Sequence, residues 1–192
     1  MLGMRVVWSL LGGTTAYALL ENERLKAERL RPPGALDENR FVGTCIRCGQ
    51  CERACPYKAI KMDNGLDGVA TGTPYIVARD NPCRLCGDFP CVSACPSGAL
   101  QPIREVKDIH MGTVVINEQT CLSWKGMRCE ICYRKCPRID KAIFIKLEHN
   151  QNTEYHAQFL PHVNTEECVG CGICEKACPL DKSAIVVRPR RG

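Results

Sequence analysis

Sixteen cysteines are the residues of this 192-residue chain whose type and spacing could do chemistry. They fall into four motifs of four, with none left over. The first and fourth motifs read C-x2-C-x2-C-x3-C-P, the second C-x2-C-x4-C-x3-C-P and the third C-x7-C-x2-C-x3-C-P. In chain order the cysteines are Cys45, Cys48, Cys51, Cys55; Cys83, Cys86, Cys91, Cys95; Cys121, Cys129, Cys132, Cys136; Cys168, Cys171, Cys174, Cys178. Thiolates grouped in this way are ligands for metal, and the question is which metal.

The regular spacing is that of bacterial ferredoxins, in which three cysteines of one run hold one cluster and the fourth, carried into a helix, holds a second cluster. Gly49 and Gly172 lie between the second and third cysteines, where a side chain would crowd a tightly wrapped loop. With four ligands each, the sixteen cysteines predict four [4Fe-4S] clusters. The alternatives are structural zinc, which prefers two separated C-x2-C pairs, and disulfides, which would be strained between thiols three residues apart.

The fourth cysteine of each motif, Cys55, Cys95, Cys136 or Cys178, is expected to complete the cluster of a partner motif. Pairing is either sequential, first with second and third with fourth, or nested, first with fourth and second with third. The regular spacing of the two outermost motifs slightly favours the nested arrangement, in which Cys178 joins Cys45, Cys48 and Cys51. In the sequential arrangement Cys95 takes that place.

The motifs repeat along the chain, with first cysteines spaced by 38, 38 and 47 residues, which indicates internal duplication. Each unit is expected to consist of a strand, a cluster loop, a short helix, a turn and a second strand. Strands are predicted at 75–78, 112–116 and 161–163 before the motifs, and at 59–60, 99–100, 142–145 and 184–187 after them. The fold class is therefore α+β, with two tandem ferredoxin-like modules of two [4Fe-4S] clusters each. The four-cluster domain is expected over residues 37–192, with cysteine motifs at 45–55, 83–95, 121–136 and 168–178.

Residues 1–36 are expected to form a truncated signal or anchor-like apolar segment followed by a charged linker. The stretch from Val6 to Leu20 is uncharged, and residues 16–18 offer an A-x-A cleavage site, but no pair of arginines precedes it. As a helix this stretch would reach roughly 22 Å, short of the roughly 30 Å hydrocarbon core of a bilayer. A helical linker is predicted from Glu21 to Arg31, ended by the prolines that follow.

The formal charge of +5 first suggests an acidic partner such as nucleic acid. That charge counts thiols as neutral, whereas each oxidised cluster with four thiolates carries about −2, which brings the total to roughly −3. No nucleic-acid partner is therefore expected, and the basic tail at 188–191 is interpreted as a solvated end.

The sequence contains no phosphate-binding loop, dinucleotide fingerprint, nucleophile elbow or haem attachment motif. A catalytic iron-sulfur enzyme remains an alternative, but it needs an iron with an open ligand position, and sixteen cysteines leave none. The chain is thus expected to be an electron carrier with no catalytic residues of its own.

The sequence resembles the NapG/MauM family of ferredoxin-type proteins, and its NapG-type members most closely. The resemblance covers residues 29 to about 187 and extends beyond the cysteines. Its matching stretches are 29–35, 48–51, 54–57, 72–75, 77–80, 95–100, 128–129, 132–134, 139–140 and 156–161.

Membership of this family would imply four [4Fe-4S] clusters and electron transfer within a periplasmic nitrate reductase system. The implied partners are a NapH-type membrane protein that oxidises quinol and, downstream, the periplasmic components that reduce nitrate. The implied location is the periplasm, with membrane association mainly through the partner, although the missing arginine pair departs from the family's export signal. A ferredoxin-type subunit of another respiratory or methylamine-oxidising complex is the alternative.

Overall fold

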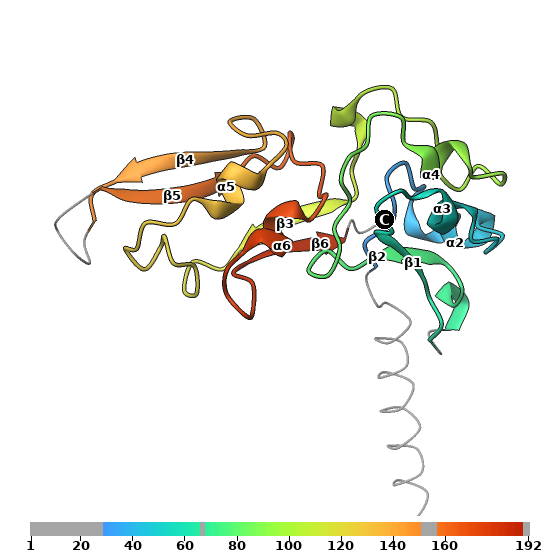
Figure 1. Cartoon of the computed structure of the whole chain (residues 1–192), viewed down its shortest axis with the longest axis horizontal. Helices are drawn as coiled ribbons and strands as arrows, with labels where there is room; N and C mark the ends of the chain where they lie inside the picture. Colours follow the sequence, from blue (N-terminus) through green and yellow to red (C-terminus); the bar gives the residue numbers. More distant parts are fainter. Residues whose placement is uncertain (1–28, 66–67, 151–156, 190–192) are drawn as a thin grey trace, which may run out of the picture.

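The computed structural model of the chain describes residues 29–65, 68–150 and 157–189, which form two modules side by side along the long axis of the molecule (Figure 1). Its elements are α2 (Glu38–Thr44), α3 (Gln50–Ala54), β1 (Ile60–Met62), the 3-10 helix η1 (Gly68–Ala70), β2 (Pro74–Ile76), α4 (Pro90–Ser93), the 3-10 helix η2 (Val106–Asp108), β3 (Gly112–Ile116), α5 (Ile131–Lys135), β4 (Ile143–Glu148), β5 (Gln158–Val163), α6 (Ile173–Ala177) and β6 (Ile185–Pro189). Within these ranges no helix is long and apolar enough to cross a bilayer.

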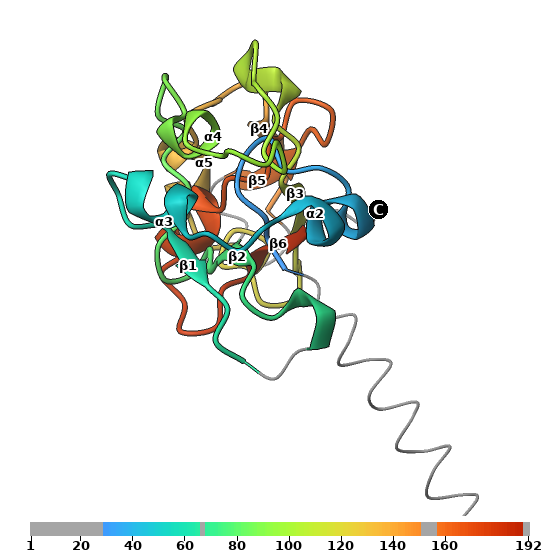
Figure 2. The ribbon, with the colours of Figure 1, turned by 90° about the vertical axis from the view of Figure 1, so that its right-hand side faces the viewer.

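The first module contains α2 to α4 with β1 and β2, and the second contains β3 to β6 with α5 and α6 (Figures 1 and 2). Antiparallel pairs of strands frame both. In the first module β1 pairs with β2, and a single bridge joins Ala35 to Leu100. In the second, β4 pairs with β5 and β3 with β6. Because a two-stranded sheet is marginally stable alone, these frames depend on what packs between them.

The predicted order of strand, cysteine loop, short helix and strand is confirmed, with two corrections. Residues 99–100 form no strand, because only Leu100 pairs, through an isolated bridge to Ala35. The fourth cysteines are not carried into helices. Cys55, Cys136 and Cys178 are the residues that directly follow α3, α5 and α6, where the backbone leaves the helix.

The hydrophobic core is thin and runs through the cysteine loops. Phe41 and Ile109 are almost completely buried, and the same cluster of buried residues includes Cys51, Cys91 and Cys171. The interior is therefore shared between apolar side chains and thiols, as the low aromatic content of 6% suggests.

The segment that leads into the first module is extended. The prediction of a helical linker is wrong for residues 29–31, because Leu30 forms a bridge to Ile76 and is buried. The buried Arg31 side chain donates 2.8 Å hydrogen bonds from Nη1 to Thr73 Oγ1 and to the Pro74 carbonyl. The remainder of the predicted linker and the apolar stretch at 6–20 lie outside the described residues.

The C-terminal arginine tail begins inside a strand. Arg188 and Pro189 belong to β6, where they pair with Thr113 and Gly112. The Arg188 side chain is exposed, in agreement with the interpretation of the tail as a solvated end, and positions 190–192 lie outside the described residues.

The two modules meet through backbone contacts around the fourth cysteine motif. The Cys83 N–H donates to the Cys171 carbonyl at 3.1 Å. Gly172, which precedes α6 with a φ of +84°, lies so close to the first module that a Cβ at this position would be 2.5 Å from the Cβ of Ala78. A side chain at position 172 would therefore force the modules apart.

The β4–β5 hairpin holds the seven-residue segment that separates the first two cysteines of the third motif. Gln158 Nε2 donates to the carbonyls of Ser123 and Trp124, both at 2.9 Å, and Asn150 Nδ2 donates to the Gly126 carbonyl at 3.0 Å. The Arg128 guanidinium lies 4.7 Å from the centre of the Phe159 ring. The β4–β5 hairpin, which lies between the third and fourth motifs, thus packs against the seven-residue segment between Cys121 and Cys129.

Gly172→Ala is expected to lower stability by about 2–4 kcal/mol, since it adds a collision with Ala78 to the cost of a left-handed backbone. Gly49→Ala is the matched control, because Gly49 has the same place in the first motif and a φ of +71°, but a Cβ added there would lie no closer than 3.8 Å to any neighbouring atom. It should cost only about 1 kcal/mol. Thermal unfolding of both variants, followed by the loss of visible absorbance, measures the difference. Equal losses would contradict close packing at the module junction.

Gln158→Ala is expected to loosen the 122–128 segment while leaving the first module unchanged. Two lost hydrogen bonds, each contributing about 1 kcal/mol, should speed hydrogen exchange of the Met127 amide roughly 5- to 30-fold. That amide donates to the Leu122 carbonyl inside the segment. Hydrogen exchange measured by mass spectrometry is the test, with the exposed Gln119→Ala as control. Unchanged exchange in Gln158→Ala would show that the hairpin does not hold the segment.

Candidate iron-sulfur cluster sites

The structure brings the sixteen cysteines together in four groups of four, each made of three cysteines from one motif and the fourth cysteine of its neighbour. None of them forms a disulfide. The groups are the first outer group (Cys45, Cys48, Cys51, Cys95), the first inner group (Cys83, Cys86, Cys91, Cys55), the second inner group (Cys168, Cys171, Cys174, Cys136) and the second outer group (Cys121, Cys129, Cys132, Cys178).

In the first module, one cavity is lined by all four cysteines of the first outer group, together with apolar residues such as Phe41 and Leu100. The first inner group is visible in the electrostatics of Cys91. The pKa of this thiol is raised to about 12, mainly by burial and in addition by charges on Cys83, Cys86, Cys55 and, from the outer group, Cys51. Helices α3 and α4, which carry Cys51 and Cys91, lie against each other.

The second module repeats this arrangement. The second outer group lines a cavity with Leu122 and Ile185 among its apolar walls. In the second inner group, burial raises the pKa of Cys174 well above its ordinary value, and the nearby Cys171, Cys168, Cys132 and Cys136 add to the effect. The charge of Cys168 in turn helps to raise the pKa of Cys136, which places Cys136 beside the fourth motif. Helices α5 and α6 pack together as α3 and α4 do.

Pairing is therefore sequential, and the slight preference for nested pairing is wrong. Cys95, not Cys178, lies with the first three cysteines of the first motif. The physical reason is the hairpin inside each module: antiparallel pairing of β1 with β2, and of β4 with β5, turns consecutive motifs to face each other. The regular spacing of the first and fourth motifs carries no information about this contact.

Left-handed backbone positions shape three of the four cysteine loops at equivalent places. The residue two positions after the first cysteine has a positive φ in each: Arg47 at 58°, Leu85 at 51° and Gly170 at 68°. Such residues let successive N–H groups face the inside of a loop, where they can donate to sulfur. In the third motif, where the spacing differs, a positive φ occurs at Gly126 instead.

Burial holds most of the thiols in their neutral form. Burial raises the pKa of Cys51 and Cys83 to about 11, and that of Cys132 and Cys171 to about 12. A metal centre that binds here must displace these protons, because the ligand is the thiolate. Iron binding is thus expected to release protons and to supply part of the folding free energy.

Cys95 and Cys178, the fourth cysteines that join the outer groups, are different. Burial raises the pKa of Cys95, but the N–H groups of Leu100, Ser97 and Ala99 and the Ser97 hydroxyl outweigh burial, and its pKa lies below the ordinary value. At Cys178, burial is likewise outweighed, by the Ser183 hydroxyl, the N–H groups of Leu180 and Ala184, and the charge of Arg79, so that its pKa is also lowered. Hydrogen bonds to cysteine sulfur are among the factors that set cluster potentials.

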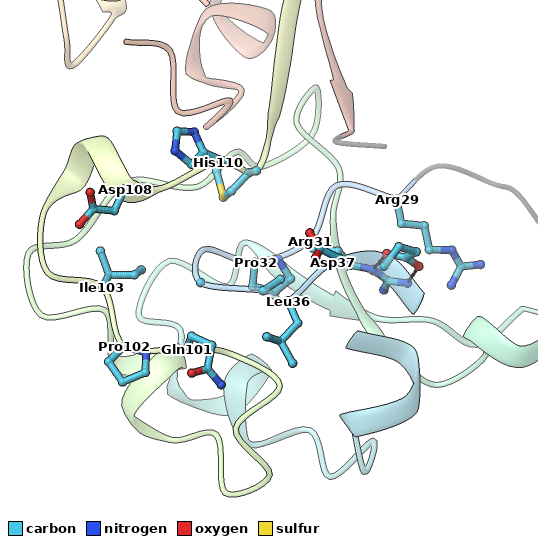
Figure 3. A pocket seen from close by; sticks show the side chains of 14 residues that line it. Arg29, Arg31, Pro32, Leu36, Asp37, Gln101, Pro102, Ile103, Asp108 and His110 are labelled. Carbon is cyan, nitrogen blue, oxygen red and sulfur yellow. Dashed lines mark hydrogen bonds and ion pairs between the residues drawn. The ribbon is translucent and has the colours of Figure 1, made fainter. Parts of the chain in front are cut away.

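A pocket of about 220 Å³ lies between residues 29–38 and 101–111 (Figure 3). Its two arginines are committed to structural contacts, since Arg29 forms an ion pair with Asp63 and Arg31 forms one with Glu38. The Arg31 guanidinium also lies 4.8 Å from the centre of the Phe41 ring. The pocket is therefore interpreted as part of the packing that fixes the first module.

Sequence reasoning identified the cysteines but missed the residues that hold their loops. Gln158 and Asn150 act through contacts with residues 24 to 35 positions away, and Arg79 contacts carbonyls about 100 positions away. Arg79 and Gln158 lie within the family-matching stretches 77–80 and 156–161, but the resemblance assigns neither residue a role. The one available signal was length: 31 residues separate Cys136 from Cys168, whereas 27 and 25 separate the earlier motifs, and the β4–β5 hairpin lies in this longer stretch.

Comparison with known proteins matches both modules to one family model. A model described as a 4Fe-4S dicluster domain matches residues 44–99 and again residues 125–182. The first match contains the complete first and second motifs, and the second contains most of the third and all of the fourth. Two dicluster domains account for four [4Fe-4S] clusters, and the structure provides four cysteine groups to receive them.

Relatives that match most of the chain are also ferredoxin-type proteins. The ferredoxin-type protein NapG of Escherichia coli (strain K12) is 50% identical over 171 residues, which cover 88% of this chain and 74% of the relative. NapG of Haemophilus influenzae is 45% identical, with 96% of this chain and 68% of the relative covered. The methylamine utilization ferredoxin-type protein MauM of Methylophilus methylotrophus is 43% identical, with 97% and 84% covered. The chain therefore belongs to the NapG/MauM family of ferredoxin-type proteins and carries four [4Fe-4S] clusters.

Proposed function

We propose that this chain is the iron-sulfur subunit that carries electrons from a quinol-oxidising, NapH-type membrane partner towards a periplasmic nitrate reductase. The single observation that carries the proposal is the grouping of all sixteen cysteines into four sets that follow one another through the molecule. Relatives named NapG, at 45–50% identity, support this assignment over other redox systems.

The ligands of the four clusters are the four cysteine groups. Cys95 and Cys55 are exchanged between the two sites of the first module, and Cys178 and Cys136 between the two sites of the second. The shared cavities of the outer groups and the electrostatic neighbours of Cys91 and Cys174 support this assignment. When bound, the clusters supply reversible one-electron transfer.

The two inner groups form the link between the modules. The hydrogen bond from the Cys83 N–H to the Cys171 carbonyl joins one residue from each inner group, and the charge of Cys83 contributes to the raised pKa of Cys171 after burial. Electrons that enter at one outer group can therefore pass through both modules without leaving the protein interior.

Partners approach the outer groups at opposite ends of the molecule. Ile46, between Cys45 and Cys48, is 63% exposed, and Met127, two residues before Cys129, is 49% exposed. Small apolar surfaces beside a redox centre suit the weak, transient contacts of electron-transfer partners. One end would meet the membrane partner and the other the periplasmic acceptor, so that membrane association occurs through the partner. The chain itself works as a carrier in the periplasm, not as an enzyme.

Serine variants test the ligand assignment. Cys45→Ser and Cys95→Ser are expected to alter the same cluster signal in electron paramagnetic resonance, and Cys121→Ser and Cys178→Ser a different one, because each pair lies in one group. Spectra of the four single variants, with iron counted on the same samples, provide the measurement. A common effect of Cys45→Ser and Cys178→Ser would contradict sequential ligation.

An anaerobic redox titration of the whole protein tests the function. Iron should be close to sixteen atoms per chain, and at least one cluster should be reduced within reach of quinol. Membranes that contain the NapH-type partner should reduce the clusters when quinol is supplied, and membranes without it should not. Clusters that all titrate far below the quinol couple would reject quinol as donor. Reduction that depends instead on methylamine-oxidising components would favour the MauM-type role, which the 43% identity to MauM keeps as the second candidate.

A further inference from the structure

Arg79 belongs to the first module, but its side chain donates to the second. It follows β2 and precedes Cys83, and its Nη1 donates to the carbonyls of Glu175 at 2.7 Å and Cys178 at 2.9 Å. Its Nη2 donates to the Leu180 carbonyl. These acceptors are in the last turn of α6 and in the turn that follows it, and the Glu175 carbonyl also accepts from the Cys178 N–H at 3.3 Å.

The first module does not need an arginine at this position for its own turn. In the third and fourth motifs the residue four before the first cysteine is an asparagine, Asn117 or Asn164, and each caps its own turn. Asn117 Oδ1 accepts from the Thr120 N–H at 3.2 Å, and Asn164 Oδ1 accepts from the Glu166 N–H at 3.1 Å. Arg79 occupies the equivalent position in the second motif, but its side chain contacts the second module.

Backbone hydrogen bonds differ in the same way. The N–H of Cys121 donates to the Asn117 carbonyl and that of Cys168 to the Asn164 carbonyl, both within one turn. The N–H of Cys83 instead donates to Cys171 across the module junction. The segment from Arg79 to Cys83 thus makes two contacts with the second module, while its local turn is closed by hydrogen bonds from the Asp80 and Asn81 N–H groups to the Val77 carbonyl.

The positive charge of Arg79 is not cancelled by a carboxylate. Among the described residues its hydrogen bonds are to backbone carbonyls, and no acidic side chain forms an ion pair with it. The charge is held at the fourth cysteine of the second outer group, to whose own carbonyl it is bonded.

We propose that Arg79 is a positioning residue through which the first module fixes the Cys178–Asp181 turn and raises the reduction potential of the cluster in the second outer group. The proposal rests on the ligand assignment given under the proposed function. Reduction adds one electron, and so one negative charge, to this site, and a fixed cation nearby stabilises the reduced form. Contact between the two modules thereby controls the reduction potential of the cluster in the second outer group.

Arg79→Gln is the direct test, in the full chain with all clusters loaded. At a fixed potential, the reduced-to-oxidised ratio of the cluster in the second outer group should fall roughly three- to tenfold, where tenfold corresponds to about 59 mV for one electron. The affected signal is recognised as the one that Cys178→Ser alters. Hydrogen exchange of the 178–181 amides should become faster in the same sample.

Arg79→Lys separates charge from geometry, because lysine keeps the charge but lacks the planar fork that reaches several carbonyls at once. It should keep the potential close to that of the original protein while exchange at 178–181 rises. Arg47→Gln is the matched control. Arg47 also donates only to carbonyls, those of Thr71 and Val69, but within the first module, so the second outer cluster should not respond.

A loss of potential confined to the second outer cluster supports the proposal. Unchanged potentials in Arg79→Gln, or an equal shift of all four clusters, would overturn it while leaving the proposed function intact. Iron far below sixteen atoms in the unsubstituted protein would instead overturn the proposed function. If Arg79→Gln loses its iron, Arg79→Lys provides the test. A large fall in the reduction potential of its second outer cluster, despite the retained charge, would reject the claim that the charge of Arg79 raises this potential.

Discussion

The exchange of the fourth cysteine between neighbouring motifs is the constraint on which the rest of this structure depends. Three cysteines of each group come from one motif, and the fourth follows the helix of the partner motif in the same module. Neither motif of a module can therefore complete a site alone, and helices α3 and α4, or α5 and α6, must lie together for the groups to form. Folding of each module and assembly of its metal sites are consequently one process.

This constraint explains how such a small apolar core is sufficient. Two-stranded sheets and helices of four to seven residues bury little surface by themselves, and the interior is filled by thiols as much as by hydrocarbon side chains. Burial keeps thiols such as Cys132 and Cys171 neutral until metal replaces their protons. Coordination supplies cross-links that the apolar contacts do not, which is why metal binding and the folding of each module are coupled.

The junction between the modules also depends on a small number of close contacts. Gly172 allows the backbone of the fourth motif to lie against Ala78, and the Cys83 N–H donates to the Cys171 carbonyl, so a backbone hydrogen bond joins the two inner groups directly. Arg79 adds a charged contact from the first module to the turn after α6. Close approach serves electron transfer, which weakens steeply with distance, and it makes the environment of one module sensitive to the other.

The sequence by itself determined the cofactor, the number of clusters, the α+β modules and most of the strands, because cysteine spacing and β-branched runs are local patterns that short-range geometry enforces. It did not determine which motifs pair: Cys95 and Cys178 have equivalent spacings, and only the hairpins β1–β2 and β4–β5 decide which loop each one faces. It assigned no role to Gln158 and Arg79, whose partners are backbone carbonyls far along the chain. A carbonyl acceptor has no residue identity, so contacts of this kind leave no pattern in the sequence and appear only when the tertiary structure brings the segments together.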